Sequence, residues 1–475
     1  MIYLKEIILK KLQSNPVAQQ MIQFGNNIGN LFPNEEALCM ASAFMQDKQT
    51  RIVVKKNRYE AQQLYQRLKP LVEDTLLFVM EESLRVQAIA SSPEDKQEQL
   101  YVLTQLVKED KPRIIICNTA AFLRYLPDKE LFKSLCFKFE VDQEITMAEL
   151  KQKLNRAGYT KVNYVDRPCT YASRGGIVDV YCLEYEHPIR IEFFDTVIES
   201  IRLFHEETQR TIQTIDSVLI NPATDLLFTD DQIEYLQKEI DSELEKQQAK
   251  LIQDDYEFLL DYIEKDKISI ENYDIDPHLY IYFSYLNANK LTDYVNGHII
   301  FSSQEEVENG YKKLNEETIS FIQEMVESHQ YLPKYSMFHD IFTFEKEHTI
   351  QMFHDFLDFK HPIFSKIETL EKSDQPLIQI LENLKGKNIY ISLDEEHTKK
   401  VQEALKAYSI HRNITFIEDD FYEGFTYEDL SVYTQQELFH RPSQIKRYQK
   451  TFKQGQILQN ILELEPNDYV VHEQY

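Results

Sequence analysis

The chain has little glycine, few cysteines and no long apolar run. Ten glycines in 475 residues leave little material for the glycine-rich loops that cradle nucleotide phosphates. The cysteines, at positions 39, 117, 136, 169 and 182, contain no CxxC pair. We therefore expect neither structural disulfides nor a zinc site, and a reducing, cytoplasmic location. No apolar stretch approaches the roughly 18 residues that a membrane span needs, so we expect no membrane partner.

Acidic residues outnumber basic ones, and the formal net charge is −27 at pH 7. This balance argues against the whole chain being an autonomous nucleic-acid binder, because neutralising phosphates requires clustered Lys and Arg. A local basic patch stays possible. The length of 475 residues allows three or four domains, each with its own core. The first residues pass directly into an amphipathic helix, without the cleavage site of a secretory signal.

The N-terminal part alternates short apolar strands with helical periodicity. We predict strands at Arg51–Lys55, Thr75–Val79 and Arg113–Cys117, and helices at Tyr59–Leu68 and Gln97–Lys108. Strands that alternate with helices in this way are typical of a parallel sheet covered on both faces. The sequence therefore predicts an α/β domain at the start of the chain.

The pattern changes twice further along. From Phe137 to about Leu227 we expect strands and hairpins, and then a charged helix from Asp230 to about Lys250. Strand-like runs follow at Leu279–Phe283 and His298–Phe301. A second α/β unit is predicted from its elements: strand Asn388–Ser392, helix Glu395–Tyr408, strand Leu430–Thr434 and helix Arg441–Leu464.

The strand predicted at 189–194 (IRIEFF) has an unusual polar face. A period of two places Ile189, Ile191 and Phe193 in the core, and it places Arg190, Glu192 and Phe194 on the opposite face. Burial does not explain a phenylalanine beside an arginine there, and this composition is typical of a protein-binding hot spot. Arg174, in the turn before another strand, is expected to join the same patch.

The wording around this strand resembles a known family. RGGI-D, then P-RIEFF, ESIR-F and TQR recur in this order in the excision-repair protein UvrB and in the N-terminal part of bacterial transcription-repair coupling factors (Mfd). Here they are Arg174–Asp179, Pro188–Phe194, Glu199–Arg202 and Thr208–Arg210. A second wording of the coupling factors, Gly424-Phe425 followed by LSVYT and ELF, covers 424–439. The match favours the coupling factors, because UvrB carries an intact phosphate loop.

The resemblance implies an α/β multi-domain fold: a degenerate RecA-like parallel-sheet domain, an inserted β-rich module like UvrB domain 2, and a small α/β domain. The expected ranges are 1–136 (domain 1a), 137–227 (domain 2), 228–345 (domain 1b), 346–440 (domain 3), a linker helix at 441–464, and 465–475 as the start of a truncated RNA-polymerase-interacting domain. The chain is thus expected to be an N-terminal fragment of a longer protein.

The resemblance also implies a function. Arg174, Arg190 and Phe194 match the positions at which domain 2 contacts UvrA, with Glu192, Gly175 and Asp179 in support. Glu192 is expected to hold Arg190 in place in the free protein. Removing a central Arg or Phe anchor typically costs about 2 kcal/mol. The expected role is a non-catalytic platform that recruits UvrA to stalled RNA polymerase; polymerase binding and ATP–Mg-driven movement on double-stranded DNA would belong to domains outside this chain.

No nucleotide site is expected. The turn Gly25–Asn34 lacks the lysine and the following Ser or Thr of a phosphate loop, and Asn34 reads as a helix N-cap with Glu35 and Glu36 in the first turn. Ser302 and Ser303 follow the strand His298–Phe301, where a metal-binding Asp-Glu pair would be needed. We therefore expect no catalytic residue, no metal and no cofactor. The alternative is a UvrB-like helicase or nuclease fragment with residual nucleotide or DNA binding.

Other candidates for chemistry are weaker. Asp394–Glu396 reads as a helix N-terminus, and Glu418–Asp420 as a solvated charge run. His348 and His354 lack the HExxH spacing of a zinc site. Cys169 and Cys182 face each other across a predicted hairpin without an identified base. A basic helix face, Lys446, Arg447, Lys450 and Lys453, is best explained as solvated.

Overall fold

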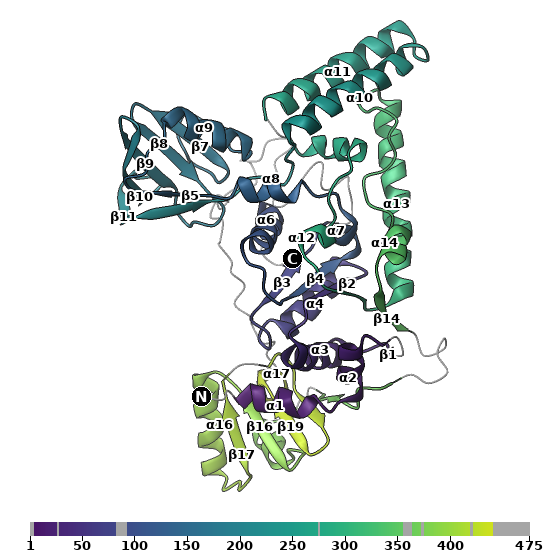
Figure 1. Ribbon diagram of the computed structural model, residues 1–475. Helices are drawn as coiled ribbons and strands as arrows, with labels where there is room; N and C mark the ends of the chain where they lie inside the picture. Colours follow the sequence, from purple (N-terminus) through teal and green to yellow (C-terminus); the bar gives the residue numbers. More distant parts are fainter. Residues whose placement is uncertain are drawn as a thin grey trace, which may run out of the picture. The chain divides into compact units, whose positions relative to one another are not determined.

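A computed structural model describes residues 4–25, 28–81, 93–273, 276–354, 363–371, 375–418 and 421–439 (Figure 1). The predicted α/β class is confirmed, since helices and strands alternate around a parallel sheet and further sheets follow. None of the helices in these ranges combines the length and the apolar character that crossing a membrane would require. The expected helix at 441–464 and the segment 465–475 lie outside the described residues.

Two distant stretches of the chain build one parallel sheet. Its order is β1-β14-β13-β2-β4-β3, and every neighbouring pair is parallel. The strands are β1 (Ile28–Gly29), β2 (Arg51–Lys55), β3 (Thr75–Phe78), β4 (Ile114–Asn118), β13 (His298–Phe301) and β14 (Ile350–His354). The strands predicted at 51–55, 75–79, 113–117 and 298–301 are confirmed within one residue. Branched apolar side chains fill both faces, as expected for a sheet covered by helices.

Helices precede and follow the strands of this sheet. The longer ones are α1 (Leu4–Leu12), α2 (Pro16–Gln23), α3 (Pro33–Asp47), α4 (Arg58–Leu68), α6 (Pro93–Lys108) and α13 (Gln304–Glu327). The shorter ones are α7 (Thr119–Leu123), α8 (Lys129–Ser134), α12 (Leu291–Tyr294) and α14 (Ile341–Glu347). The predicted N-cap at Asn34 is wrong, because α3 begins at Pro33 and Phe32 is the capping residue. Proline suits this first position, since it needs no backbone N–H there.

Residues 137–220 form two antiparallel-rich sheets. The larger has the order β11-β10-β9-β8-β7-β6, and the smaller pairs β5 with β12. Their strands are β5 (Phe137–Glu140), β6 (Thr160–Lys161), β7 (Thr170–Arg174), β8 (Ile177–Tyr181), β9 (Ile189–Phe194), β10 (Val197–Phe204), β11 (Thr211–Ile215) and β12 (Ser217–Ile220). The expected change to strands and hairpins is confirmed. One helix, α9 (Met147–Arg156), was not predicted; it buries Leu150 and Leu154.

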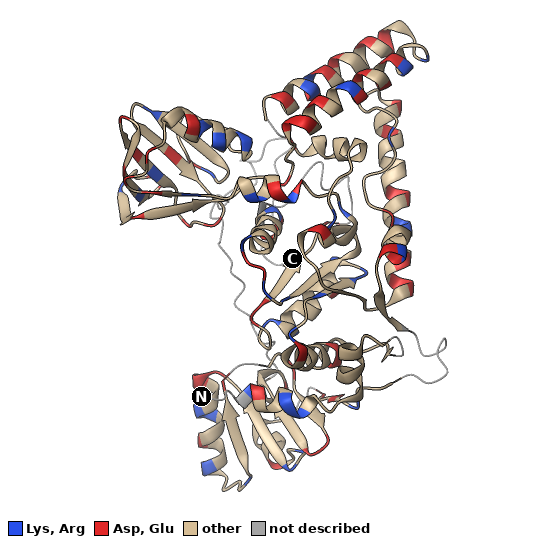
Figure 2. Cartoon of the chain, viewed as in Figure 1, with Lys and Arg blue, Asp and Glu red and all other residues tan. Residues whose placement is uncertain are grey.

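A helical hairpin follows, built from α10 (Asp230–Gln248) and α11 (Gln253–Glu271). The long helix predicted from Asp230 is confirmed, and Thr229 caps it. Acidic side chains lie along α10, α11 and α13 (Figure 2). The strand predicted at Leu279–Phe283 is wrong: the segment is a 3₁₀ helix, η1 (Pro277–Tyr285), and all five residues are buried. Burial on all sides gives an apolar run without the period that distinguishes strand from helix.

The last described part is a five-stranded sheet of order β15-β18-β19-β16-β17. Its elements are β15 (Glu368–Thr369), α15 (Leu377–Glu382), β16 (Asn388–Ser392), α16 (Glu395–Ala407), β17 (Ile414–Ile417), β18 (Phe425–Tyr427), β19 (Leu430–Tyr433) and α17 (Gln435–Phe439). The predicted strands at 388–392 and 430–434 and the helix at 395–408 are confirmed. Asp394 caps α16, which confirms the helix N-terminus predicted there.

The Gly424 and ELF wording has a structural explanation. The Glu437 carboxylate accepts hydrogen bonds from the backbone N–H and the hydroxyl of Thr434, at 2.9 and 2.7 Å. A Cβ atom at Gly424 would lie 2.6 Å from Oε2 of Glu437, so only glycine leaves room for this buried acid. Burial raises the pKa of Glu437 above its ordinary value. These residues therefore hold α17 onto its sheet.

Candidate protein-docking site

The two faces of β9 differ as the sequence predicts. Ile189 and Ile191 are fully buried, and Phe193 is 9% exposed. Phe194, the next residue, is 74% exposed. Alternation places Arg190 and Glu192 on the face of Phe194, and the strand register adds Asp179 from β8 and Arg202 from β10. We call this surface of the larger sheet the docking face: Arg174, Asp179, Arg190, Glu192, Phe194 and Arg202.

Asp179 is the fixed point of the docking face. It is 2% exposed and lies directly opposite Arg190 in the strand pairing. Nε of Arg190 donates to Oδ1 of Asp179 at 2.7 Å, and Nη2 donates to Oδ2 at 2.8 Å. Nη2 of Arg174 donates to the same Oδ2 at 3.3 Å. One buried carboxylate therefore orients two arginines that extend to the surface.

Two further contacts restrain Arg190. Its Nη2 also donates to Oε1 of Gln209 at 2.8 Å, and its guanidinium carbon lies 4.3 Å from the centre of the Phe204 ring. The hydrogen bonds from Asp179 outweigh burial and raise the pKa of Arg190. The side chain is thus charged and held in one orientation before any partner arrives, which lowers the entropy cost of binding.

A glycine turn positions Arg174. The β7–β8 hairpin closes at the Arg174–Ile177 pair, leaving Gly175 and Gly176 as the two turn residues. Gly175 has φ +56°, a left-handed conformation that favours glycine. The carbonyl of Gly176 accepts a hydrogen bond from the backbone N–H of Phe193 at 2.8 Å, so the turn is tied to β9. Arg174 is consequently kept beside the exposed end of β9.

Glu192 has a different role from the one expected. Its carboxylate pairs with Arg202, and it accepts a hydrogen bond from the Ser200 hydroxyl at 2.8 Å. The Arg202 bond lowers the pKa of Glu192. Asp179, rather than Glu192, holds Arg190. The sequence analysis missed Arg202 and Gln209, although both belong to the ESIR and TQR wording that carried the resemblance.

The carboxyl-terminal edge of the parallel sheet has no lysine-bearing glycine loop among its described residues. Glu36, in the first turn of α3, instead pairs with Lys55 at the end of β2; Oε2 and Nζ are 2.9 Å apart. The Ser302 hydroxyl donates to the other oxygen of Glu36 at 2.6 Å. Ser303 caps α13 through the backbone N–H of Glu306. These side chains are paired with one another.

The remaining candidates stay structural. No cluster of three or more His, Cys, Asp or Glu side chains in the described ranges is placed to hold a metal ion. All five cysteines are free, and burial raises the pKa of Cys136 and of Cys169 to about 11, which disfavours the reactive thiolate. The side chain of His354, the acids Asp419 and Asp420, and the basic residues at 446–453 lie outside the described residues.

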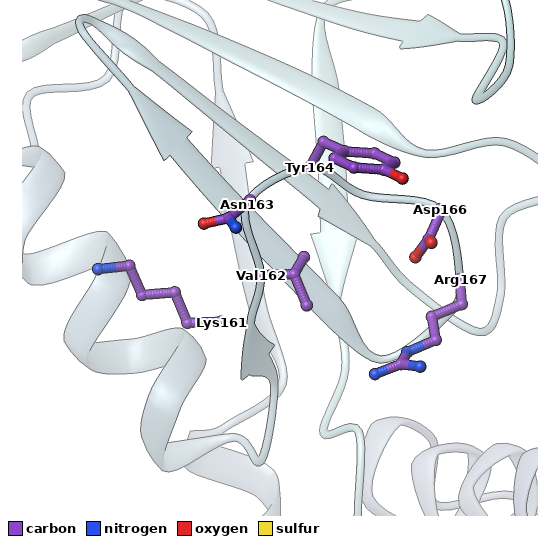
Figure 3. A pocket seen from close by; sticks show the side chains of 6 residues that line it. All are labelled: Lys161, Val162, Asn163, Tyr164, Asp166 and Arg167. Atoms are coloured by element: carbon purple, nitrogen blue, oxygen red, sulfur yellow. The ribbon is translucent and has the colours of Figure 1, made fainter.

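A shallow hollow of about 460 Å³ opens at the β6–β7 connection (Figure 3). Its lining residues are Lys161, Val162, Asn163, Tyr164, Asp166 and Arg167. Tyr164 is exposed, and Asp166 and Arg167 lie on the same stretch of loop. The hollow combines charges of both signs and is open to solvent, as is usual for a surface loop.

Comparison with known proteins covers both the docking face and the chain around it. Residues 137–226 match the family described as the UvrB interaction domain. A transcription-repair-coupling factor of Bacillus subtilis (strain 168) is 28% identical over 457 residues, covering 88% of this chain and 38% of the relative. The chain is a relative of the transcription-repair-coupling factors, as predicted. Two more coupling factors match: that of Staphylococcus haemolyticus at 26% identity over 514 residues (99% of this chain, 43% of the relative), and that of Staphylococcus epidermidis (strain ATCC 12228) at 25% over 488 (94% and 41%).

The match to the coupling factors bears on the site in two ways. The chain spans about two fifths of the length of the curated relatives it matches. The matched UvrB interaction domain contains every residue of the docking face, from Arg174 to Arg202. The strongest family signal and the most unusual surface therefore lie on the same sheet.

Proposed function

We propose that the docking face binds UvrA through Arg174, Arg190 and Phe194. In this role the chain is the recruitment platform of a transcription-repair coupling factor and links stalled RNA polymerase to nucleotide excision repair. The observation that carries the proposal is the pair formed by Arg190 and Phe194: an ordered cation and a bare aromatic ring on one face of β9, inside the range that matches the UvrB interaction domain.

The physical case rests on cost. Phe194 is 74% exposed, so its ring would lose its contact with water on docking and contribute binding energy without loss of folding energy. Arg190 is already held by Asp179, so little conformational entropy remains to be lost. Arg174 is more exposed and makes one long bond to Asp179, which leaves most of its donors available for a partner.

We also propose the domain arrangement that the resemblance implies. The parallel sheet built from 28–118 and 298–354 would be a RecA-like domain without an ATP site, interrupted by domain 2 at 137–227 and completed by 228–345. The sheet between 368 and 433 would be domain 3. In this arrangement the chain is not an enzyme, and it takes no cofactor. Polymerase binding and ATP-driven movement on double-stranded DNA would belong to domains beyond it.

Binding to purified UvrA tests the docking proposal. Affinity would be measured by calorimetry for the wild type and for Arg174→Ala, Arg190→Ala and Phe194→Ala. We expect each change to weaken binding, with a loss of about 2 kcal/mol for a central anchor. Phe258→Ala is the matched control, because Phe258 is 55% exposed on α11, away from the docking face in the chain. Unchanged affinity in all three variants would show that the site is misassigned.

The second candidate is a helicase or nuclease fragment with residual nucleotide binding, as in UvrB. The parallel sheet is the observation that favours it, because open α/β sheets bind ligands at the carboxyl ends of their strands. Titration of the chain with ATP and Mg²⁺ separates the two. Saturable binding in the micromolar range would contradict a non-catalytic platform, whereas the proposed function predicts no heat of binding.

A further inference from the structure

The sealed edge of the parallel sheet points beyond the docking function, and it does not depend on UvrA. Three elements end or begin at this edge: β2 ends at Lys55, β13 ends just before Ser302, and the first turn of α3 carries Glu36. In parallel α/β proteins this is where anions bind, because a helix N-terminus, a lysine and a hydroxyl converge on them. Here the same three kinds of group converge on a side chain of the protein.

Both oxygens of the Glu36 carboxylate are used. Oε2 lies 2.9 Å from Nζ of Lys55, and Oε1 accepts the Ser302 hydroxyl hydrogen at 2.6 Å. Glu36 is 1% exposed, and Lys55 and Ser302 are also largely withdrawn from water. The two partners come from different strands of the sheet, and 266 positions separate Ser302 from Glu36. Glu36 therefore bridges the two halves of the parallel sheet where an anion would lie.

A further donor lies in the same turn. Asn34 is 5% exposed, and its side-chain amide nitrogen has no hydrogen-bond partner within the described residues. Burying an unpaired donor costs free energy unless a ligand or a water satisfies it. The adjacent acid, Glu35, behaves differently from Glu36: it caps α3 by accepting the backbone N–H of Phe32 at 2.9 Å, and it accepts the Ser365 hydroxyl.

We propose that this edge is an anion-binding site whose anion is the protein's own Glu36 carboxylate. Lys55, Ser302 and the N-terminus of α3 form the cradle, and Glu36 takes the place of a phosphate group. The edge is thus closed by an internal ion pair in addition to lacking a glycine loop. Removing the carboxylate opens a cavity of cationic and donor character that accepts a small oxyanion, for which inorganic phosphate is the probe.

The test is a gain of binding. Glu36→Ala and the shape-preserving Glu36→Gln would be compared with the wild type in phosphate at constant ionic strength, with chloride replacing phosphate as the reference salt. Thermal unfolding and calorimetry report the binding. We expect Glu36→Ala to bind phosphate about tenfold more tightly than the wild type and to show a phosphate-dependent rise in Tm. Glu36→Ala combined with Lys55→Ala loses this gain.

Glu35→Ala is the matched control, because it removes a neighbouring acid that caps the helix without touching Lys55. It should bind phosphate no better than the wild type. The proposal is overturned if Glu36→Ala and Glu36→Gln gain no phosphate-dependent stabilisation, or if adding Lys55→Ala leaves the gain intact. Acetylation of the wild type gives an independent readout: Lys55 should be protected with or without phosphate, while the exposed Lys161 reacts. An acetylated Lys55 would contradict an occupied cradle.

Discussion

Asp179 and Arg190 form a two-point ion pair across neighbouring strands, with N–O distances of 2.7 and 2.8 Å. The acid is buried and the guanidinium group reaches the surface, so the pair connects the core of the sheet to the docking face. Bidentate pairs of this kind fix orientation as well as charge. The first prediction follows from this geometry.

Asp179→Ala should weaken UvrA binding by about tenfold, although Asp179 itself is buried. Arg190 would lose two of its three hydrogen-bonded contacts, and folding stability should fall by about 2 kcal/mol. A double-mutant cycle with Arg190→Ala, read by calorimetry, distinguishes positioning from general damage: the two losses of affinity should not add. Additive losses would mean that Asp179 acts elsewhere.

Phe193 and Phe194 should respond oppositely to the same substitution. Phe194→Ala is expected to cost about 2 kcal/mol of UvrA affinity and to leave the Tm unchanged, because the ring is exposed. Phe193→Ala should lower folding stability by about 3 kcal/mol, because it empties a core position. Urea unfolding and binding, measured on both variants, check the pair. A destabilised Phe194→Ala variant would show that its ring packs against the protein.

Gly175→Ala should destabilise the chain by about 1 kcal/mol, since a Cβ atom disfavours φ +56° even though nothing crowds it. Gly175→Asn should cost less, because asparagine tolerates the left-handed conformation better than alanine does. Urea unfolding midpoints measure the difference. Equal costs for the two variants would indicate that space rather than backbone conformation decides at this turn.

His278 should make stability depend on pH. Burial lowers its pKa, but the hydrogen bonds to Asp266 at 2.7 Å and to Asp276 outweigh burial, and the pKa is raised overall. The folded state therefore favours the protonated ring. The stability it contributes is fully present below the unfolded pKa of about 6.5 and is lost as pH rises through the raised folded pKa.

Comparing Tm between the wild type and His278→Gln across this pH range measures the contribution. The difference in Tm should be largest at pH 5.5 to 6 and should shrink above the folded pKa, which histidine NMR titration locates. Asp266 also accepts the Tyr282 hydroxyl at 2.7 Å, so Tyr282→Phe serves as a control that alters the same acid without removing a titrating ring. A difference that grows with pH would contradict the assigned direction.

Local pattern was sufficient for the elements with a clear period or a strong apolar run. β2, β13 and β16 were predicted within a residue, and alternation in β9 correctly separated Phe193 from Phe194. η1 was missed because an apolar segment buried on all sides carries no period. The capping box of α9, Thr146 with Glu149, was a readable signal that the surrounding strands obscured.

The partners within the site were less predictable, for a physical reason. Arg202 meets Glu192 only through the pairing of β9 with β10, and the register of that pairing shifts at a bulge between Ile198 and Ser200. Ser302 meets Glu36 across 266 positions. Such pairs depend on tertiary placement, and no local spacing encodes them.

The alternation in β9 also restricts how this strand can evolve. A single-residue insertion or deletion between Ile189 and Phe194 would shift every following side chain to the opposite face. Core isoleucines would then meet solvent while an arginine entered the core, so folding and partner recognition would be lost in one step. Length variation should therefore collect in the connecting segment 182–188 rather than within the strand, a pattern visible in any family of related sequences.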